Sequence, residues 1–148
     1  MKSIHIIGID PGKNGGIARV TFTNKYNWSA YKCPEDINSM SDILKTFKKF
    51  AIKPICYLEK VHAFPTDARS SAFKFGMNFG IWQGILAALN IETILVTPQA
   101  WQKDLELSKI KQERKNELKK IAIDVSGIKA TLKTADAICI TNWGVQNV

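Results

Sequence analysis

The sequence contains few of the residues that build disulfide frameworks or structural zinc sites. It has two histidines and three cysteines, and the cysteines (Cys33, Cys56 and Cys139) are far apart in the chain. No pair of them has the short spacing of zinc ligands, and an odd number does not suit a disulfide framework. We therefore expect reduced cysteines, with Cys56 and Cys139 in the core because both stand in apolar segments.

Long apolar runs are also missing. No run approaches the roughly 18 residues that cross a bilayer, and the first residues do not have the pattern of a secretory signal. The composition is otherwise that of an ordinary globular domain, with 45% apolar and 23% charged residues. For a chain of 148 residues we expect one domain over residues 1–148, inside the cell and without a membrane partner.

Acidic residues are outnumbered by basic ones. The 13 Asp and Glu residues stand against 21 Lys and Arg residues, which gives a formal net charge of +8. An excess of this size favours a polyanionic partner, and nucleic acid before a membrane surface. The alternative is that the lysines only keep the protein in solution.

One of the scarce acids, Asp10, follows an apolar run. The segment 4–18 reads IHIIGIDPGKNGGIA, and its first six residues are typical of a strand buried on both faces. A carboxylate at the end of such a strand is costly unless a cation meets it. Asp10 also precedes Pro11 and Gly12, and Asp-Pro-Gly commonly forms a β-turn. Two interpretations of Asp10 therefore stand, a metal ligand and a turn residue.

The spacing of apolar residues predicts a mixed α/β sheet. The predicted strands span residues 4–9, 17–22, 28–33, 55–58 and 93–97. The predicted helices span 37–50, 72–90 and 109–125, and a last one starts near Thr131 or Thr134. In the first helix, the apolar face would hold Ile43, Leu44, Phe47 and Phe50. This order implies that the first strand is central and that the fourth lies parallel beside it, in the strand order 3-2-1-4-5.

Two further acids are placed to join Asp10. Glu59 follows the strand 55–58, so it would end beside Asp10 at the same edge of the sheet. Asp136 stands in the first turn of the last helix, where the helix dipole alone also favours an acid. Three converging carboxylates repel one another unless divalent cations neutralise them, and hard oxygen ligands suit Mg²⁺ or Mn²⁺. With two ions, one activates a water and the other stabilises a departing 3′ oxygen.

Five fragments in fixed order carry a family resemblance. They read IGIDPG with GGIA, LEKVHAFP, SSAFKFGMNFGIWQGIL, VTPQAWQK and ADAICI. In this order the sequence resembles the RuvC-type Holliday junction resolvases of the RNase H-like fold, especially the small versions of bacteriophages and a related plastid group. The resemblance implies a Mg²⁺-dependent endonuclease, with Mn²⁺ as a substitute and two ions per site. It also implies a homodimer that nicks opposing strands of a four-way DNA junction in the cytoplasm of a bacterial or phage-infected cell, with an organelle as the alternative.

The resemblance also assigns residues to roles. It implies that Asp10, Glu59 and Asp136 are the catalytic metal ligands. It implies that His62 and Phe64 lie in a loop that probes the junction. The full set of residues that we expect to contact DNA is His62, Phe64, Arg69, Lys74, Lys103, Lys111, Lys115 and Lys133. The residues it places in the dimer interface are Gly76, Phe79, Gly80, Gln83 and Gly84.

Two of these assignments have structural alternatives. Phe64 could stack on bases at the junction, since every base offers a π-face, or it could pack back on the core. The glycines at 76, 80 and 84 each cost about 1 kcal/mol of helix propensity relative to Ala. That cost makes sense where another backbone approaches, either from the sheet of the same subunit or from a second subunit.

The sequence departs from the family pattern at two positions. Lys133 stands where many members carry a fourth acid, so it could hold a phosphate or weaken a second metal site. After the V-x-P motif, Gln102 takes the place of a basic residue, which shifts to Lys103. Two alternatives therefore remain beside the junction resolvase. One is a broader nuclease for forks and flaps, and the other is a junction-binding protein with weak catalysis.

Overall fold

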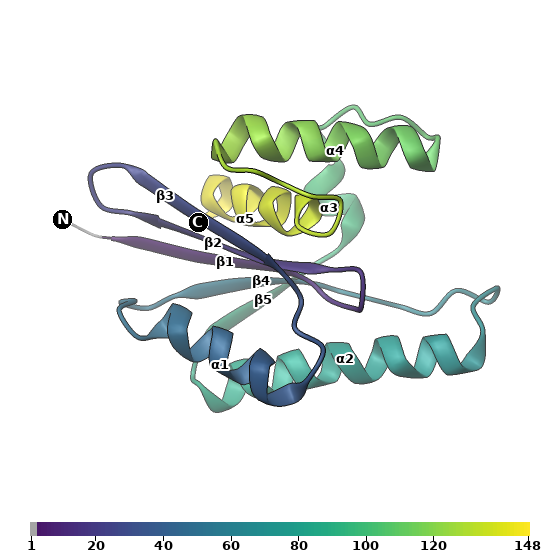
Figure 1. Cartoon of the computed structure of the whole chain (residues 1–148), viewed down its shortest axis with the longest axis horizontal. Helices are drawn as coiled ribbons and strands as arrows, with labels where there is room; N and C mark the ends of the chain where they lie inside the picture. The colour runs from purple at the N-terminus through teal and green to yellow at the C-terminus, as the bar shows by residue number, and fades with distance from the viewer. Residues whose placement is uncertain (1–2) are drawn as a thin grey trace.

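A computed structural model describes residues 3–148, and its five strands form one sheet in the order β3-β2-β1-β4-β5 (Figure 1). The strands are β1 (Ile4–Asp10), β2 (Gly16–Phe22), β3 (Tyr26–Lys32), β4 (Ile55–Glu59) and β5 (Glu92–Val96). The first three pair antiparallel, and β4 pairs parallel with both β1 and β5. The predicted mixed sheet and its strand order are confirmed.

Helices cover both faces of this sheet. They are α1 (Ile37–Lys48), α2 (Arg69–Ala88), α3 (Pro98–Gln102), α4 (Lys111–Ser126) and α5 (Ala135–Asn147). Figure 1 shows α1 and α2 on one side of the sheet and α4 and α5 on the other, with α5 against the strands. Within residues 3–148, none of the helices has the length and apolar character needed to span a bilayer.

The strands fill a core on each face of the sheet. In β1, Ile6 packs into the cluster under α5, whereas Ile7 and Ile9 pack into the cluster under α1 and α2. This two-sided burial is what the apolar run of β1 predicted. The three cysteines are buried free thiols, as expected for Cys56 and Cys139.

The end of α1 differs from the prediction. Asp36 begins this helix, because its Oδ1 accepts a hydrogen bond of 2.8 Å from the backbone N–H of Ser39. The helix ends at Lys48, with Phe47 as its last buried residue. Phe50 therefore lies beyond the last turn, and its side chain is 82% exposed. The predicted burial of Phe50 is wrong.

Other boundaries were misplaced where no cap signals them. Helix α2 begins three residues before the predicted start at 72, and α4 begins two residues after the predicted start at 109. Their cap residues, Ala68 and Ile110, make no side-chain cap hydrogen bond. The short helix α3 was not predicted at all, since five residues are too few to show a helical period.

Glycine allows α5 to lie directly on β1. A Cβ built at Gly8 would come within 2.7 Å of the Ala137 carbonyl oxygen and of the Thr141 backbone nitrogen. At the other end of the helix, Gly144 leaves room for the ring of Tyr57. The backbone of α5 is thus held against the central strand, which brings the start of the helix to the end of β1.

Candidate active site

Asp10 is the last residue of β1, and the turn after it is tied to α2. Gly12 adopts a φ of +112°, and its N–H donates a hydrogen bond of 2.8 Å to Oδ1 of Asn78. Gly15 closes the turn by donating to the Gly12 carbonyl at 3.1 Å. The Cys33 thiol donates to the Asp10 carbonyl oxygen at 3.3 Å. The hydrogen-bonded turn therefore spans residues 12–15 and not the Asp-Pro-Gly segment itself. Asp10 is still part of β1, and its carboxylate lies at the sheet edge.

Glu59 ends β4, the strand parallel to β1. Its backbone is in register with Val96 of β5, and its carboxylate accepts a hydrogen bond of 2.6 Å from Nε1 of Trp101. Trp101 lies in α3 and is 2% exposed. No local sequence pattern indicates this bond, because it joins residues from separate elements.

Asp136 reaches the same edge from α5. Gly16, the first residue of β2, packs against the backbone of Lys133 and Thr134 at the start of this helix. Asp136 follows Thr134 by two residues, and its charge raises the pKa of Asp10 at the end of β1. Asp10, Glu59 and Asp136 all line one groove. The three predicted carboxylates therefore share one groove.

The surroundings of these acids oppose their ionisation. Burial raises the pKa of Asp10 well above its ordinary value, and the charges of Asp136 and Glu59 raise it further. The side chain of Glu59 next to it adds to this rise in the pKa of Asp10. Burial raises the pKa of Glu59 to about 7, even though the Trp101 N–H lowers it. Burial raises the pKa of Asp136 to about 6, against the effect of Lys115 and Arg114.

The donor set suits a hard divalent cation. Three desolvated carboxylates that repel one another are stabilised when a cation lies between them. Within residues 3–148, no three His, Cys, Asp or Glu side chains stand close enough together to hold a metal ion by themselves. An open set of oxygens is what Mg²⁺ takes, since it keeps several waters and binds one or two carboxylates together with phosphate oxygens.

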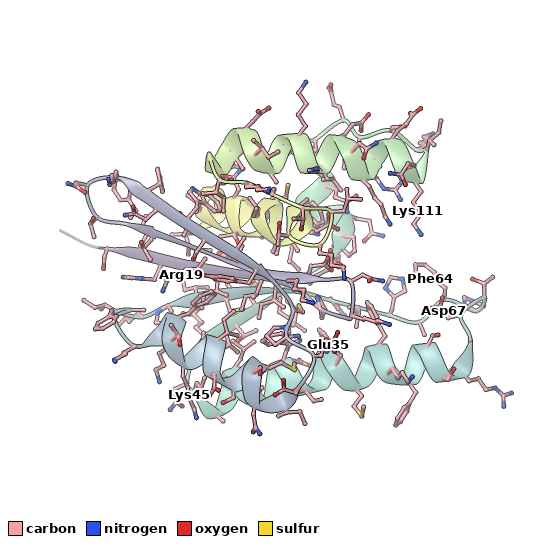
Figure 2. All side chains as sticks on the ribbon, viewed as in Figure 1. Arg19, Glu35, Lys45, Phe64, Asp67 and Lys111 are labelled. Carbon is pink, nitrogen blue, oxygen red and sulfur yellow. The ribbon has the colours of Figure 1, made fainter. Side chains whose placement is uncertain are left out.

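The groove around the acids is large and mostly basic at its rim. Its volume is about 1280 Å³. The cations that line it are Lys13, Lys74, Lys111, Arg114, Lys115 and Lys133. Lys111 lies on its α4 side, and Glu35 lies on the side of α1 (Figure 2). A negatively charged ligand entering this groove would meet cations from the turn after β1, from α2, from α4 and from the segment before α5.

Comparison with known proteins gives matches in structure. No protein-family model matches the sequence, and no curated protein matches it. Thermus thermophilus RuvC in complex with a Holliday junction substrate superposes with a TM-score of 0.60 and 16% identity, over 93% of this chain and 90% of that chain. The fowlpox virus resolvase with Holliday junction DNA gives 0.55 and 11%, over 97% and 99%. The yeast mitochondrial Holliday junction resolvase gives 0.52 and 16%, over 95% and 77%.

The chain has the RuvC-type resolvase fold. At 11–16% identity the similarity establishes the fold. Of the residues expected to contact DNA, Lys74, Lys111, Lys115 and Lys133 line the groove of the RuvC-type fold. The other four, His62, Phe64, Arg69 and Lys103, do not line it.

Several residues that line the groove were not predicted from the sequence. Lys13 extends from the turn after β1, and Arg114 lies one helical position before Lys115. Gln102 lines the groove, whereas the neighbouring Lys103 does not. The spacing of α4 could have indicated Arg114, because residues 111, 114 and 115 share one helix face.

Phe64 extends from the loop before α2 (Figure 2). Its side chain is 58% exposed, and its ring lies 4.7 Å from the ring of His62 between centroids. Its backbone N–H donates to Oδ2 of Asp67 at 2.8 Å. The alternative in which Phe64 packs back on the core is therefore wrong. Stacking of Phe64 on a base stays a prediction.

The glycine stripe of α2 faces away from the sheet. A Cβ at Gly76, Gly80 or Gly84 would have no atom within 4 Å. The alternative in which these glycines admit the sheet of the same subunit is therefore wrong. Gln83 lies exposed on this side, whereas Phe79 packs partly buried against the core.

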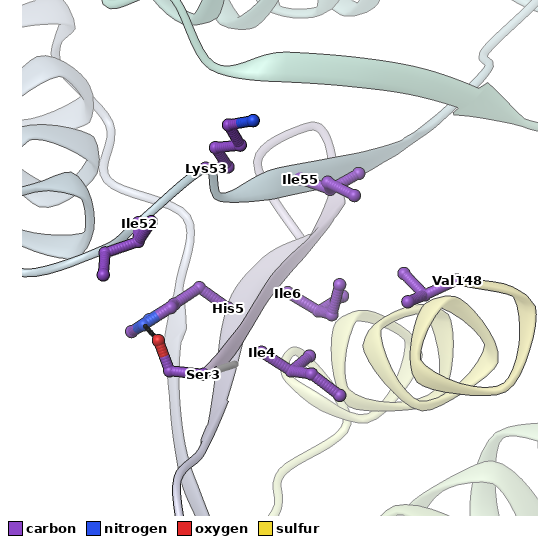
Figure 3. Close-up of a pocket in the computed structure, with 8 residues that line it drawn as sticks. All are labelled: Ser3, Ile4, His5, Ile6, Ile52, Lys53, Ile55 and Val148. Carbon is purple, nitrogen blue, oxygen red and sulfur yellow. Dashed lines mark hydrogen bonds between the residues drawn. The ribbon is translucent and has the colours of Figure 1, made fainter. Parts of the chain in front are cut away.

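A smaller cavity of about 480 Å³ lies at the opposite end of β1 and β4 (Figure 3). It is lined mainly by isoleucines, and the Ser3 hydroxyl bonds to Nε2 of His5 at 3.0 Å there. None of its described lining residues is acidic. The groove that holds Asp10, Glu59 and Asp136 lies at the other end of these two strands.

The acids should make the metal-free protein more stable at lower pH. Their folded pKa values are raised, so their contribution to stability is complete below pH 4 and is lost as pH rises through about 6 to 7. In EDTA, the free energy of unfolding should fall by on the order of 2–3 kcal/mol between pH 5 and pH 8. Urea unfolding at each pH measures this slope. Glu59→Gln should flatten it, and an equal slope in that variant would contradict the assignment.

Proposed function

We propose that this protein is a metal-dependent endonuclease that resolves four-way DNA junctions by paired nicks in opposing strands. The observation that carries the proposal is the meeting of Asp10, Glu59 and Asp136 in one basic groove at the edge of a RuvC-type sheet. The solved proteins with this fold include resolvases bound to Holliday junction DNA. The groove therefore has both the positive charge that would bind branched DNA and the carboxylates that would bind the metal ions.

In this proposal, different groove residues would bind the DNA and hold the metal ions. Groove cations would bind the phosphate backbone, which carries most of the affinity in protein–DNA contacts. Asp10, Glu59 and Asp136 would hold two divalent ions, which would activate a water and stabilise the departing 3′ oxygen. Lys115 and Arg114 act on the charge of Asp136 and lie in the same groove. They would hold the cleaved phosphate beside the acids.

A homodimer would supply two such sites to one junction. Helix α2 supports this arrangement, because the face of the helix that points away from the sheet is apolar and exposed. Along with the open glycines, Phe73 is 71% exposed and Met77 is 51% exposed. Small residues let two helices approach closely, and apolar neighbours provide the free energy of association.

The test is a gel assay on a labelled four-way junction, with fork, flap and linear duplex in parallel, in Mg²⁺ or in EDTA. Symmetric paired nicks that need the metal are expected on the junction. Equal cutting of forks and flaps would favour the broader nuclease. Tight binding without nicks in Mg²⁺ or Mn²⁺ would favour a junction-binding protein, and Lys133 in the groove would be the first residue to change.

Gly80→Leu should abolish the dimer and leave the subunit folded. Within the subunit the added side chain meets open space, but it would separate two helices packed at the glycine stripe. Light scattering after gel filtration should show a monomer, with a thermal midpoint within a few degrees of the wild type. Asn116→Leu adds the same side chain to an exposed position of α4 and should leave the dimer intact. A dimer in both variants would place the interface elsewhere.

A further inference from the structure

We propose that Trp101 is a positioning residue for Glu59, and that its indole N–H sets how this carboxylate faces a bound divalent ion. This role rests on the proposed metal-dependent function. Trp101 does not line the groove, and it is only 2% exposed. It acts through the hydrogen bond of 2.6 Å from Nε1 to Oε2 of Glu59.

The bond closes a ring of contacts that starts and ends at Glu59. The backbone of Glu59 is in register with Val96, and the next N–H, of Lys60, donates to the Val96 carbonyl at 2.8 Å. Thr97 follows Val96 and begins α3, its side-chain oxygen accepting from the Ala100 N–H at 3.2 Å. Helix α3 then carries Trp101 back to the Glu59 carboxylate. The strand pairing and the helix cap together hold the Nε1–H donor of Trp101 against Oε2 of Glu59.

A carboxylate needs such a partner to present a defined edge. The last torsion of a glutamate is broad, so an unbonded carboxylate rotates freely. Neighbouring residues that hydrogen-bond to a metal-binding carboxylate orient it, and the loss of such a bond typically costs about 10- to 100-fold in metal affinity or activity. Indole suits this task because it is a donor only and carries no charge. It therefore does not compete with Glu59 for a cation, and it does not become an acceptor.

The chain offers a matched control in Trp82. This tryptophan is fully buried in the other core cluster, and its Nε1 has no hydrogen-bond partner within the described residues. Trp82→Phe therefore removes an indole N–H and the same side-chain volume as Trp101→Phe, but it breaks no hydrogen bond in the described part of the chain. Trp101→Phe removes the same atoms and the bond to Glu59. The difference between the two variants isolates the hydrogen bond.

The first measurement is Mn²⁺ binding by titration calorimetry, on folded protein checked by thermal unfolding. Trp101→Phe should bind Mn²⁺ about 10- to 100-fold more weakly than the wild type, and Trp82→Phe should bind it as the wild type does. In parallel, the indole N–H resonance that disappears in Trp101→Phe should move when Mg²⁺ is added to the wild type. The indole resonance that disappears in Trp82→Phe should stay in place.

Junction cleavage separates this inference from the proposed function. If Trp101 positions Glu59, raising the Mg²⁺ concentration should restore much of the cleavage that Trp101→Phe loses. If the wild type cuts junctions and both variants bind Mn²⁺ equally well, the positioning role is overturned and the nuclease stands. If the wild type cuts nothing while its Trp101 resonance still responds to Mg²⁺, the proposed reaction fails and the positioning of Glu59 stands.

Discussion

Replacing Asp10 with Asn should lower the rate of junction cleavage at least about 1000-fold, which corresponds to about 4 kcal/mol of lost transition-state stabilisation. Asn keeps the shape of the side chain but removes the charge that a cation needs. Asp10 is the acid on which both of the others act, since the charges of Asp136 and Glu59 raise its pKa. Single-turnover cleavage of a labelled junction in Mg²⁺ measures the loss.

Junction binding and stability should survive the same change. The groove cations are untouched in Asp10→Asn, so affinity for the junction in Ca²⁺ or EDTA should stay within a few fold of the wild type. The thermal midpoint in EDTA should be equal or higher, because a buried and repelled carboxylate has been neutralised. Loss of binding together with cleavage would indicate that Asp10 holds the turn and has no part in the chemistry.

Replacing Gly8 with Ala should destabilise the whole domain. The new Cβ would lie 2.7 Å from the Ala137 oxygen and from the Thr141 nitrogen, both of them backbone atoms. The helix α5 would have to lift from β1, which we expect to cost about 3 kcal/mol or more. For a chain of this size that lowers the thermal midpoint by about 6–12 °C. Calorimetric or circular-dichroism melting measures the change.

A second variant tests whether the backbone causes this loss. The Thr141 hydroxyl also lies against Gly8, and it donates to the Ala137 carbonyl at 2.7 Å. Thr141→Ala in the Gly8→Ala background removes the side-chain part of the conflict and leaves the backbone part. The double variant should recover less than half of the lost stability. Full recovery would show that α5 tolerates the extra methyl group and that only the hydroxyl interferes.

Patterns within single segments allowed most of the fold to be predicted. The run before Asp10 is apolar at every position of β1 that faces either core, which placed this strand in the centre. Strand–helix alternation then made β4 its parallel neighbour, and the ends of parallel strands coincide. The meeting of Asp10 and Glu59 followed from topology alone, and Asp136 followed once the last helix was placed over β1.

The rest depends on contacts between segments. The Trp101–Glu59 bond joins two residues that no local pattern relates, and α3 is too short to show a helical period. Phe50 has the spacing of a buried residue, but its helix ends before it is reached. The outward direction of Gly80 also depended on how α2 is rotated against the sheet, which a single apolar stripe of Phe79 and Trp82 leaves ambiguous.

Because α5 is the last element of the chain and packs on β1, the site is completed late in synthesis. Asp10 and Glu59 belong to early strands, whereas Asp136 and the helix that carries it come from the last part of the chain. A ribosome adds about 5–20 residues per second, so the first two acids exist for several seconds before the third. Through that interval β1 lacks its covering helix and the groove lacks one wall. The acids are therefore assembled only after α5 has been made, and a growing chain holds an incomplete site.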